Sequence, residues 1–289
     1  MTSINKRIGI DLGGTKTEVA VLDTDGATLF RRRVPTPAGD YDGILSTIRT
    51  LVQEARAIAG ADASIGIGTP GTRSRATGLM IDANSTVLIG KPLYDDLVRL
   101  LGQRISMAND ANCFVLSEAT DGAAREYRVV FGVILGTGVG GAIAVDKRVL
   151  DGANGIAGEW GHNPLPWPQD GELPGPRCYC GKCGCIETFL SGPALARETA
   201  VHGEDAALAA YEYRLARALA SIINVLDPDA VVFGGGVSNV ARLYVNVPKL
   251  LTRYVFSDTV RTRLLAAMHG DSSGVRGAAM LGGERETHV

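Results

Sequence analysis

An acid, a pair of glycines, a hydroxyl and a lysine lie between two apolar stretches near the start of the chain. Asp11 closes the first apolar stretch of RIGIDLGGTKTEVAVLD. The turn that follows contains Gly13, Gly14, Thr15 and Lys16. A plain hairpin would need only Asn-Gly or Asp-Gly at this point. Backbone N–H groups of a glycine-rich turn suit phosphate oxygens, and a neighbouring carboxylate can face Mg²⁺ through water. A phosphate-binding turn is therefore one interpretation of these residues, and a hairpin that needs glycine only for its backbone conformation is the other.

The same pattern returns in the second half of the chain. VVFGVILGTGVGGAIAVD, residues 129–146, again predicts a strand, a turn at Gly136, Thr137 and Gly138, and a strand. A single hairpin of this kind could need glycine only for its backbone conformation. Two such hairpins, both with a threonine in the turn, favour a site that binds the phosphates of a nucleotide. The second turn also fits G-x-G-x-x-G, but the dinucleotide fingerprint requires a helix at its last glycines, and AIAVD predicts a strand there.

Four of the five cysteines crowd into CYCGKCGC, as Cys178, Cys180, Cys183 and Cys185. A disulfide framework would spread its cysteines along a short secreted chain. Such dense thiols in a chain of 289 residues without a signal peptide indicate a metal site instead.

A candidate general base lies in NDAN, where an expected strand runs into an expected helix. Phosphoryl transfer to an alcohol needs a group that accepts the hydroxyl proton, and Asp110 could be that group. Asp and Asn also favour the N-cap position of helices. On the residues alone both interpretations of Asp110 stand, and one side chain could fulfil both roles.

Strands and helices alternate along the chain, which predicts an α/β fold. Expected strands cover residues 7–11, 16–22, 27–34, 64–68 and 105–108, the pair within 129–146, and the stretch AVVFGGG. Expected helices cover residues 41–59, 93–103, 206–226, about 240–254 and 274–281, with another from NDAN to about residue 124. Residues 151–187, which contain the cysteines, are expected to be irregular.

Composition narrows the class of protein. Hydrophobic residues make up 45% and charged residues 21% of the chain, and 29 basic residues stand against 31 acidic ones. This balance disfavours a nucleic-acid partner. The start MTSINKR lacks the apolar core of a signal peptide, and no apolar run is long enough to span a membrane. We therefore expect a cytoplasmic protein.

Six sequence blocks carry a resemblance to a known family. DLGGTKTE, NDAN, GTGVGG, GEWGH, CYCGKCGCIE and VVFGGG occur in the order found in ROK-family sugar kinases, and the resemblance spans nearly the whole chain. DANSTVLIGKPL, GEWGHNPLPW and HGDSSGVRGAA are most similar to bacterial fructokinases, also called manno(fructo)kinases. The resemblance implies the actin/hexokinase-like (ribonuclease H-like) ATPase fold, with two lobes around a cleft and a zinc knuckle.

The resemblance also implies how the chain divides. Residues 1–115 with 275–289 would form a small α/β lobe. Residues 116–274 would form a large α/β lobe, whose zinc-binding segment would be 159–187. Family habit suggests a homodimer.

The implied activity is that of a transferase, an ATP- and magnesium-dependent hexose kinase with Asp110 as general base. D-fructose, phosphorylated at its 6-hydroxyl, is the expected substrate. A glucokinase or an N-acetylhexosamine or mannose kinase of the same family is the alternative. A sugar-sensing regulator is more distant, because few residues precede the first block and a helix-turn-helix would not fit there. A zinc-knuckle nucleic-acid binder is disfavoured by the low aromatic content of 6%.

Site residues follow from the positions that match the family blocks. The sugar is expected to be bound by Asn84, Asn109, Asp110, Glu159, His162 and Glu187. ATP and Mg²⁺ are expected at Asp11, Gly13, Gly14, Thr15, Lys16, Gly136, Thr137, Gly138, Gly234, Gly235 and Gly236. A solvated strand-edge lysine is an equally good interpretation of Lys16. Zinc is expected at His162, Cys178, Cys180 and Cys185. Cys183 departs from the family pattern, and it could replace His162 as a ligand or be a spare thiol.

Overall fold

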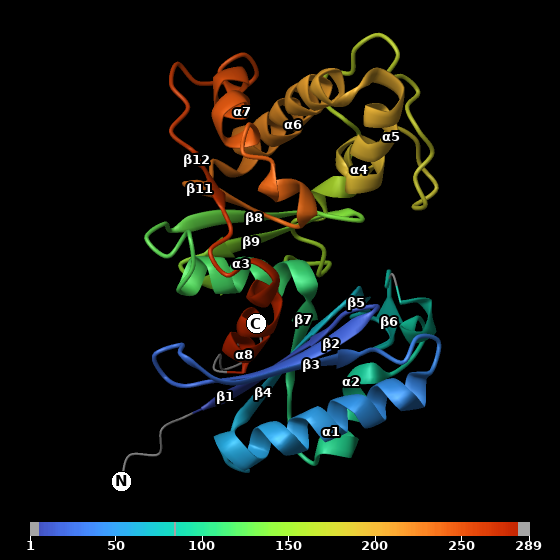
Figure 1. The fold of residues 1–289 in the computed structure, drawn as a ribbon, viewed down its shortest axis with the longest axis vertical. Coiled ribbons are helices and arrows are strands. Elements are labelled where there is room, and N and C mark those ends of the chain that lie inside the picture. The colour runs from blue at the N-terminus through green and yellow to red at the C-terminus, as the bar shows by residue number, and fades with distance from the viewer. Residues whose placement is uncertain (1–5, 84, 283–289) are drawn as a thin grey trace. The chain divides into compact units, whose positions relative to one another are not determined.

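The computed structural model describes residues 6–83 and 85–282, in which strands and helices alternate as the sequence predicts (Figure 1). The chain forms two compact units. Unit 1 combines the chain up to Ser117 with residues 151–155 and the end of the chain from Asp271, and unit 2 comprises residues 118–150 and 156–270. None of the helices in the described ranges has the length and apolar character needed to cross a bilayer.

Unit 1 is built on a five-stranded sheet in the order β3-β2-β1-β4-β7. Its strands are β1 (Arg7–Leu12), β2 (Lys16–Leu22), β3 (Thr28–Pro35), β4 (Ser64–Thr69) and β7 (Ser106–Asn109). The first three pair antiparallel, whereas β4 lies parallel to both β1 and β7. Helices α1 (Tyr41–Ala59) and α2 (Leu93–Leu101) cover one face of this sheet, and α8 (Ser273–Leu281) covers the other (Figure 1). Short elements complete the unit: β5 (Thr72–Arg73), β6 (Met80–Ile81) and the 3₁₀ turn η1 (Thr86–Leu88).

Successive residues of β1 point to opposite faces of the sheet, and the two faces have different neighbours. Ile8 and Ile10 are fully buried in the core that also contains the apolar side of α1. Gly9 points the other way, and a Cβ there would lie 2.1 Å from the carbonyl oxygen of Val275 in α8. Gly66 on β4 likewise leaves no room for a Cβ beside the backbone of α8. Glycine at these positions therefore lets the backbone of α8 lie directly on the sheet.

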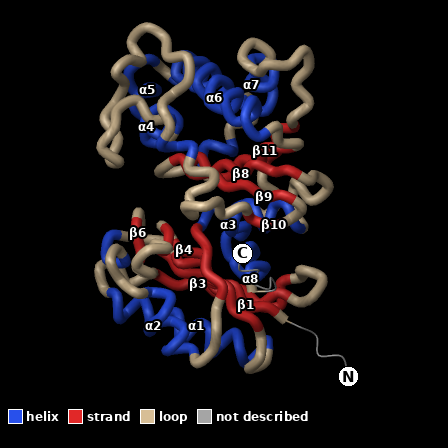
Figure 2. The backbone as a smooth tube through the Cα atoms, turned by 180° about the vertical axis from the view of Figure 1, so that it is seen from behind, coloured by secondary structure: helices blue, strands red, loops and turns tan. Residues whose placement is uncertain are grey.

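Unit 2 repeats the plan with the strand order β10-β9-β8-β11-β12. Its strands are β8 (Val129–Leu135), β9 (Val139–Val145), β10 (Arg148–Val149), β11 (Ala230–Gly234) and β12 (Arg263–Ala266). Its helices are α4 (Ile186–Leu190), α5 (Gly192–His202), α6 (Glu204–Leu226) and α7 (Leu243–Leu251). The 3₁₀ turns are η2 (Trp160–His162) and η3 (Gly236–Asn239), and η4 (Gly270–Ser272) falls where unit 2 meets the last part of unit 1 in sequence. Between β10 and α4 the chain is almost entirely loop, tan in Figure 2.

The structure corrects several expected boundaries. The helix expected over 240–254 spans only Leu243–Leu251, because residues 241–242 before it and 252–254 after it form turns. Helix α5 was not predicted, since Ala194 is its only residue among the buried ones and its apolar pattern is weak. Strand β12 was also missed, because four residues give too short a pattern.

Candidate functional site

Candidate acids of unit 1 gather at the carboxyl ends of three parallel strands. Asp11 pairs in register with Gly68 of β4, and Thr69 pairs with Asn109 of β7. Asp110 follows Asn109 directly and begins α3 (Asp110–Thr120). Because parallel strands end at one edge of a sheet, Asp11 and Asp110 face the same edge, and Gly68 places no side chain between them.

The start of α3 separates two roles that the sequence left open for Asp110. The Oδ1 atom of Asn109 accepts a hydrogen bond from the N–H of Asn112 at 2.8 Å, as an N-cap residue does. The Oδ1 atom of Asp110 accepts from the adjacent N–H of Ala111, also at 2.8 Å, and not from an N–H further along the helix among the described residues. Asn109 therefore caps the helix, and the exposed Asp110 is accessible to a small molecule in solution.

The pKa values of both carboxyls on this edge are raised. Burial is the largest cause that raises the pKa of Asp11 to about 7, and the charges of Asp110 and Glu18 raise it further. Arg33 acts in the opposite direction. Asp110 keeps contact with solvent, yet the protein packed around it disfavours its charged form and raises its pKa. A cation at this edge would favour the ionised forms.

The first glycine turn is held by a threonine from β3's end. The N–H of Gly13 donates to the carbonyl oxygen of Lys16 at 3.0 Å. Thr36 donates its N–H to the carbonyl of Thr15 at 3.0 Å and its hydroxyl to that of Gly13 at 2.8 Å. Gly14, Thr15 and Lys16 are exposed, so the outer rim of the turn is accessible. The expected sugar residue Asn84 lies outside the described residues.

Unit 2 brings its two glycine runs together. Strands β8 and β11 are parallel neighbours, with Ile134 opposite Gly234. Gly235 has a φ of 82°, and a Cβ there would lie 2.4 Å from the carbonyl oxygen of Leu135. The Gly136–Gly138 turn and the Gly234–Gly236 run therefore occupy adjacent strand ends, at the edge where α/β sheets bind ligands.

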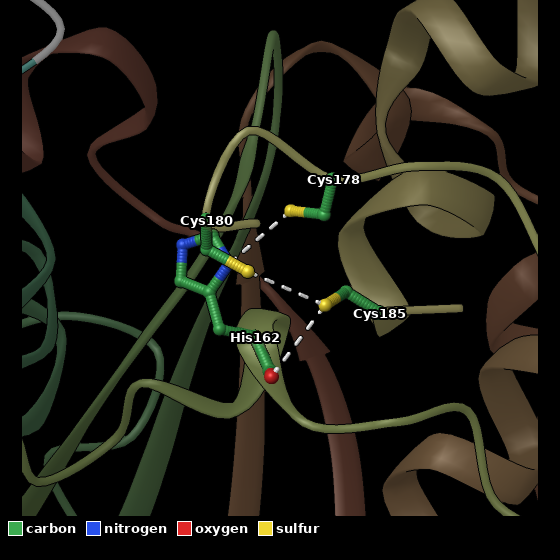
Figure 3. Close-up of side chains that lie close together, drawn as sticks. All are labelled: His162, Cys178, Cys180 and Cys185. Atoms are coloured by element: carbon green, nitrogen blue, oxygen red, sulfur yellow. Dashed lines mark hydrogen bonds between the residues drawn. The ribbon is translucent and has the colours of Figure 1, made fainter. Parts of the chain in front are cut away.

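Four of the sequence-predicted metal ligands converge (Figure 3). The ligand atoms of His162, Cys178, Cys180 and Cys185 all lie within 4.8 Å of one another. The Sγ atoms of Cys180 and Cys185 are 3.6 Å apart, as are the Cys178 Sγ and the His162 Nδ1. Tetrahedral zinc with bonds of about 2.3 Å to sulfur would separate two sulfurs by roughly 3.8 Å. Three thiols and one imidazole at this spacing could hold a zinc ion.

The cluster includes His162 and not Cys183, the alternative fourth ligand. Cys183 is exposed and is not among the four clustered residues. Its backbone pairs with Arg177 across the knuckle instead. On the other side of His162, its Nε2 lies 2.9 Å from the hydroxyl of Tyr179, a contact of the kind that orients metal-bound imidazoles.

The three expected sugar residues of unit 2 lie around this cluster. Glu159 is exposed and directly precedes η2, which contains His162. Glu187 is the second residue of α4, which begins directly after Cys185. The Oε2 atom of Glu187 accepts a hydrogen bond from the N–H of Val139 at 2.8 Å, which places its carboxylate beside the Gly136–Gly138 turn.

Sequence patterns gave no sign of four supporting residues. Thr36 holds the first glycine turn, and its role depends on the pairing of β2 with β3. The N–H groups of Val139 and Gly192 and the hydroxyl of Tyr179 contact the unit 2 site. Backbone groups carry no residue signature, so only the folded structure identifies them.

Comparison with known proteins gives this arrangement a family. Residues 7–285 match the model of the ROK family. The chain is 40% identical to the N-acetyl-D-glucosamine kinase of Pectobacterium atrosepticum over 298 residues, which covers 94% of this chain and 97% of that relative.

Solved structures of the same family have a similar fold. The ROK hexokinase from Thermus thermophilus shares 28% identity at a TM-score of 0.83, covering 96% of this chain and 97% of its own. A ROK family glucokinase from Streptomyces griseus, solved with glucose and AMPPNP, shares 28% identity at a TM-score of 0.77, covering 96% and 98%. The strand-end acids, the glycine turns and the Cys/His cluster thus lie in an α/β fold of the hexokinase type, and the chain belongs to the ROK family.

Proposed function

We propose that this protein is a sugar kinase that transfers the γ-phosphoryl group of ATP to a hexose hydroxyl, with Asp110 as general base. The observation that carries this proposal is the division of roles at the start of α3. Asn109 caps the helix, so the carboxylate of Asp110 is free to accept a proton. Its raised pKa makes it a stronger base once ionised.

The remaining residues have roles in positioning. Asp11 would face Mg²⁺, which would neutralise charge on the phosphates when bound with ATP. The turn at Gly13, Gly14 and Thr15, with Lys16, would offer N–H groups and a positive charge to phosphate oxygens. In unit 2, Gly136, Thr137 and Gly138 would bind phosphates, and Gly234, Gly235 and Gly236 would lie on the adenosine side. Asn109, Glu159, His162 and Glu187 would hydrogen-bond sugar hydroxyls.

Zinc would have a structural role in this proposal. His162, Cys178, Cys180 and Cys185 would hold it, because their donor set and spacing fit a closed four-coordinate site. The residues that follow and precede these ligands, Glu187 and Glu159 among them, would be ordered by the ion.

We infer that D-fructose is the substrate, phosphorylated at its 6-hydroxyl. The inference is supported by the stretches GEWGHNPLPW and HGDSSGVRGAA, which resemble bacterial fructokinases. A second candidate is N-acetyl-D-glucosamine, because the relative from Pectobacterium atrosepticum is a kinase of that sugar and is 40% identical. Sites that hydrogen-bond to the hydroxyl groups of a substrate discriminate strongly between sugars. The two candidate substrates therefore predict different results in a kinase assay.

A coupled assay of ADP release separates them. Purified protein with MgATP would be offered D-fructose, N-acetyl-D-glucosamine, D-glucose and D-mannose in turn. We expect the highest kcat/KM with D-fructose. A higher kcat/KM with N-acetyl-D-glucosamine would replace the substrate while keeping the kinase, whereas no sugar-dependent ADP release with any hexose would overturn the proposed function.

A further inference from the structure

Glu187 lies close to the metal cluster in sequence, and its carboxylate also contacts the backbone beside a glycine turn. Its Oε2 accepts a hydrogen bond from the N–H of Val139 at 2.8 Å. We propose that Glu187 is a positioning residue for the Gly136–Gly138 turn, and that the metal cluster thereby supports nucleotide binding. This inference rests on the proposed function, because it takes the turn to bind ATP phosphates.

The turn is shaped to accept this carboxylate. A Cβ at Gly138 would lie 2.6 Å from the Oε2 of Glu187, closer than atoms can approach, so glycine leaves the room that the carboxylate fills. The N–H of Gly136 donates to the carbonyl of Gly138 at 3.0 Å and closes the turn itself. A hydrogen bond between a carboxylate and a backbone N–H is of the charge-assisted, stronger kind.

The same segment holds the other end of the turn. The N–H of Gly192, the first residue of α5, donates to the carbonyl of Gly136 at 2.7 Å. A Cβ at Gly192 would lie 3.1 Å from that oxygen, so the two backbones are in close contact. Glu187 and Gly192 are five positions apart, with Ser191 N–H bonded to the Glu187 carbonyl at 3.1 Å. One short segment therefore fixes both ends of the turn.

The metal cluster adjoins the start of this segment, whose Ile186, Phe189 and Leu190 also pack in the apolar core of unit 2. Helix α4 has only five residues, too few to be stable without tertiary contacts. Cys185 directly precedes it, and the hydroxyl of Thr188 donates to the Cys185 carbonyl at 2.7 Å. The N–H of Ile186 donates to the carbonyl of Asn163, next to His162, at 2.9 Å. A metal bound by His162 and Cys185 would therefore lock the start of α4, and with it the carboxylate of Glu187.

Among the described residues, only Val139 forms a hydrogen bond with the carboxylate of Glu187, through Oε2. Its Oε1 could bind the sugar while Oε2 holds the turn, so a single side chain would connect both substrates. Coupling of this kind is reciprocal in binding free energy. Metal, nucleotide and Glu187 should therefore stabilise one another even when no sugar is present.

Calorimetric binding of Mg·AMPPNP without sugar tests the inference. Glu187→Ala should weaken AMPPNP at least tenfold, whereas Glu187→Gln should keep most of the affinity, because an amide oxygen can accept from Val139 N–H. Glu198→Ala, which removes an acid of α5 that pairs with Arg214 and His202, is the matched control and should bind as wild type does. Unchanged affinity in a folded Glu187→Ala protein would overturn the inference and leave the kinase intact.

Two further measurements test the inference, one with glycine variants and one on metal release. Gly138→Ala should weaken AMPPNP more than Gly136→Ala does, since a Cβ at Gly136 has no atom closer than 4.0 Å. In the Glu187→Ala background the additional loss from Gly138→Ala should shrink. Bound AMPPNP should also slow the release of metal to a chromogenic chelator. Equal losses in the two backgrounds, or metal release that AMPPNP leaves unchanged, would contradict the inference. Failure of wild-type protein to bind AMPPNP at all would instead overturn the proposed function.

Discussion

Asp11 and Asp110 show how neighbouring acids at one strand edge acquire different properties. Asp11 is partly buried beside Glu18, and its pKa rises to about 7 mainly through burial. Asp110 lies exposed at the helix start, where hydrogen bonds from its own N–H and that of Ala111 oppose the rise. A carboxyl that is half protonated near neutral pH would ionise fully when Mg²⁺ binds beside it. The edge is thus prepared for a cation.

The raised pKa of Asp11 makes the free energy of unfolding depend on pH. The unfolded chain loses the Asp11 proton near 3.8, whereas the folded protein keeps it until about 7. The folded state therefore binds more protons in this range, and its free energy of unfolding should fall as pH rises from about 4 to about 7. Asp11→Asn should remove this fall, and the difference between the two proteins should be flat above about pH 7. Denaturant titrations of magnesium-free protein that retains its zinc, at a series of pH values, measure it, and parallel curves would contradict the assignment.

At the scale of elements, we expect the irregular segment between β10 and α4 to depend for its order on a metal at the Cys/His cluster. This segment has few elements of its own, apart from η2, and two isolated bridges tie it together: Pro164 with Cys185 and Arg177 with Cys183. Such a chain can be ordered by a metal, since binding energy of a structural zinc ion is energy of folding. A zinc ion there would add to the apolar contacts that Trp160 and Leu165 make with the core of unit 2.

Cysteine replacement tests this dependence with a control in the same stretch. Cys178→Ser should lose the metal and lower the midpoint of thermal unfolding, because it removes a clustered thiol. Cys183→Ser should retain about one zinc per chain and unfold as wild type does, because Cys183 lies outside the cluster. Metal analysis and thermal melts of both variants would show it. Metal loss from Cys183→Ser with retention in Cys178→Ser would exchange the two roles.

Local signals predicted elements well and long-range contacts poorly. Helix α1 is confirmed at its expected bounds, because Asp40 caps it, Gly60 follows it and its apolar stripe is regular. The turns at Gly13 and Gly136 were also predictable, since each lies between two patterned strands. The contact of Glu187 with Val139 joins residues 48 positions apart, and no local pattern encodes it.

At the scale of the whole molecule, two units of similar plan each contain some of the proposed site residues. Each unit has a five-stranded sheet in which a glycine turn connects the two strands of an antiparallel hairpin. Unit 1 supplies the acids Asp11 and Asp110, and unit 2 supplies the metal cluster and Glu187. The ROK match over residues 7–285 covers both units. Turnover should therefore depend on residues of each unit, while binding of one substrate can survive loss of a residue needed only for chemistry.

The turnover of Asp110→Asn tests the central claim most directly. Asparagine keeps the shape and cannot accept a proton, so kcat with MgATP and the preferred hexose should fall at least roughly 100-fold. Sugar affinity, measured by calorimetry, should stay within a few-fold of wild type. That split is the result the account predicts. Near-wild-type kcat in Asp110→Asn would contradict it, because the proton would then be accepted elsewhere.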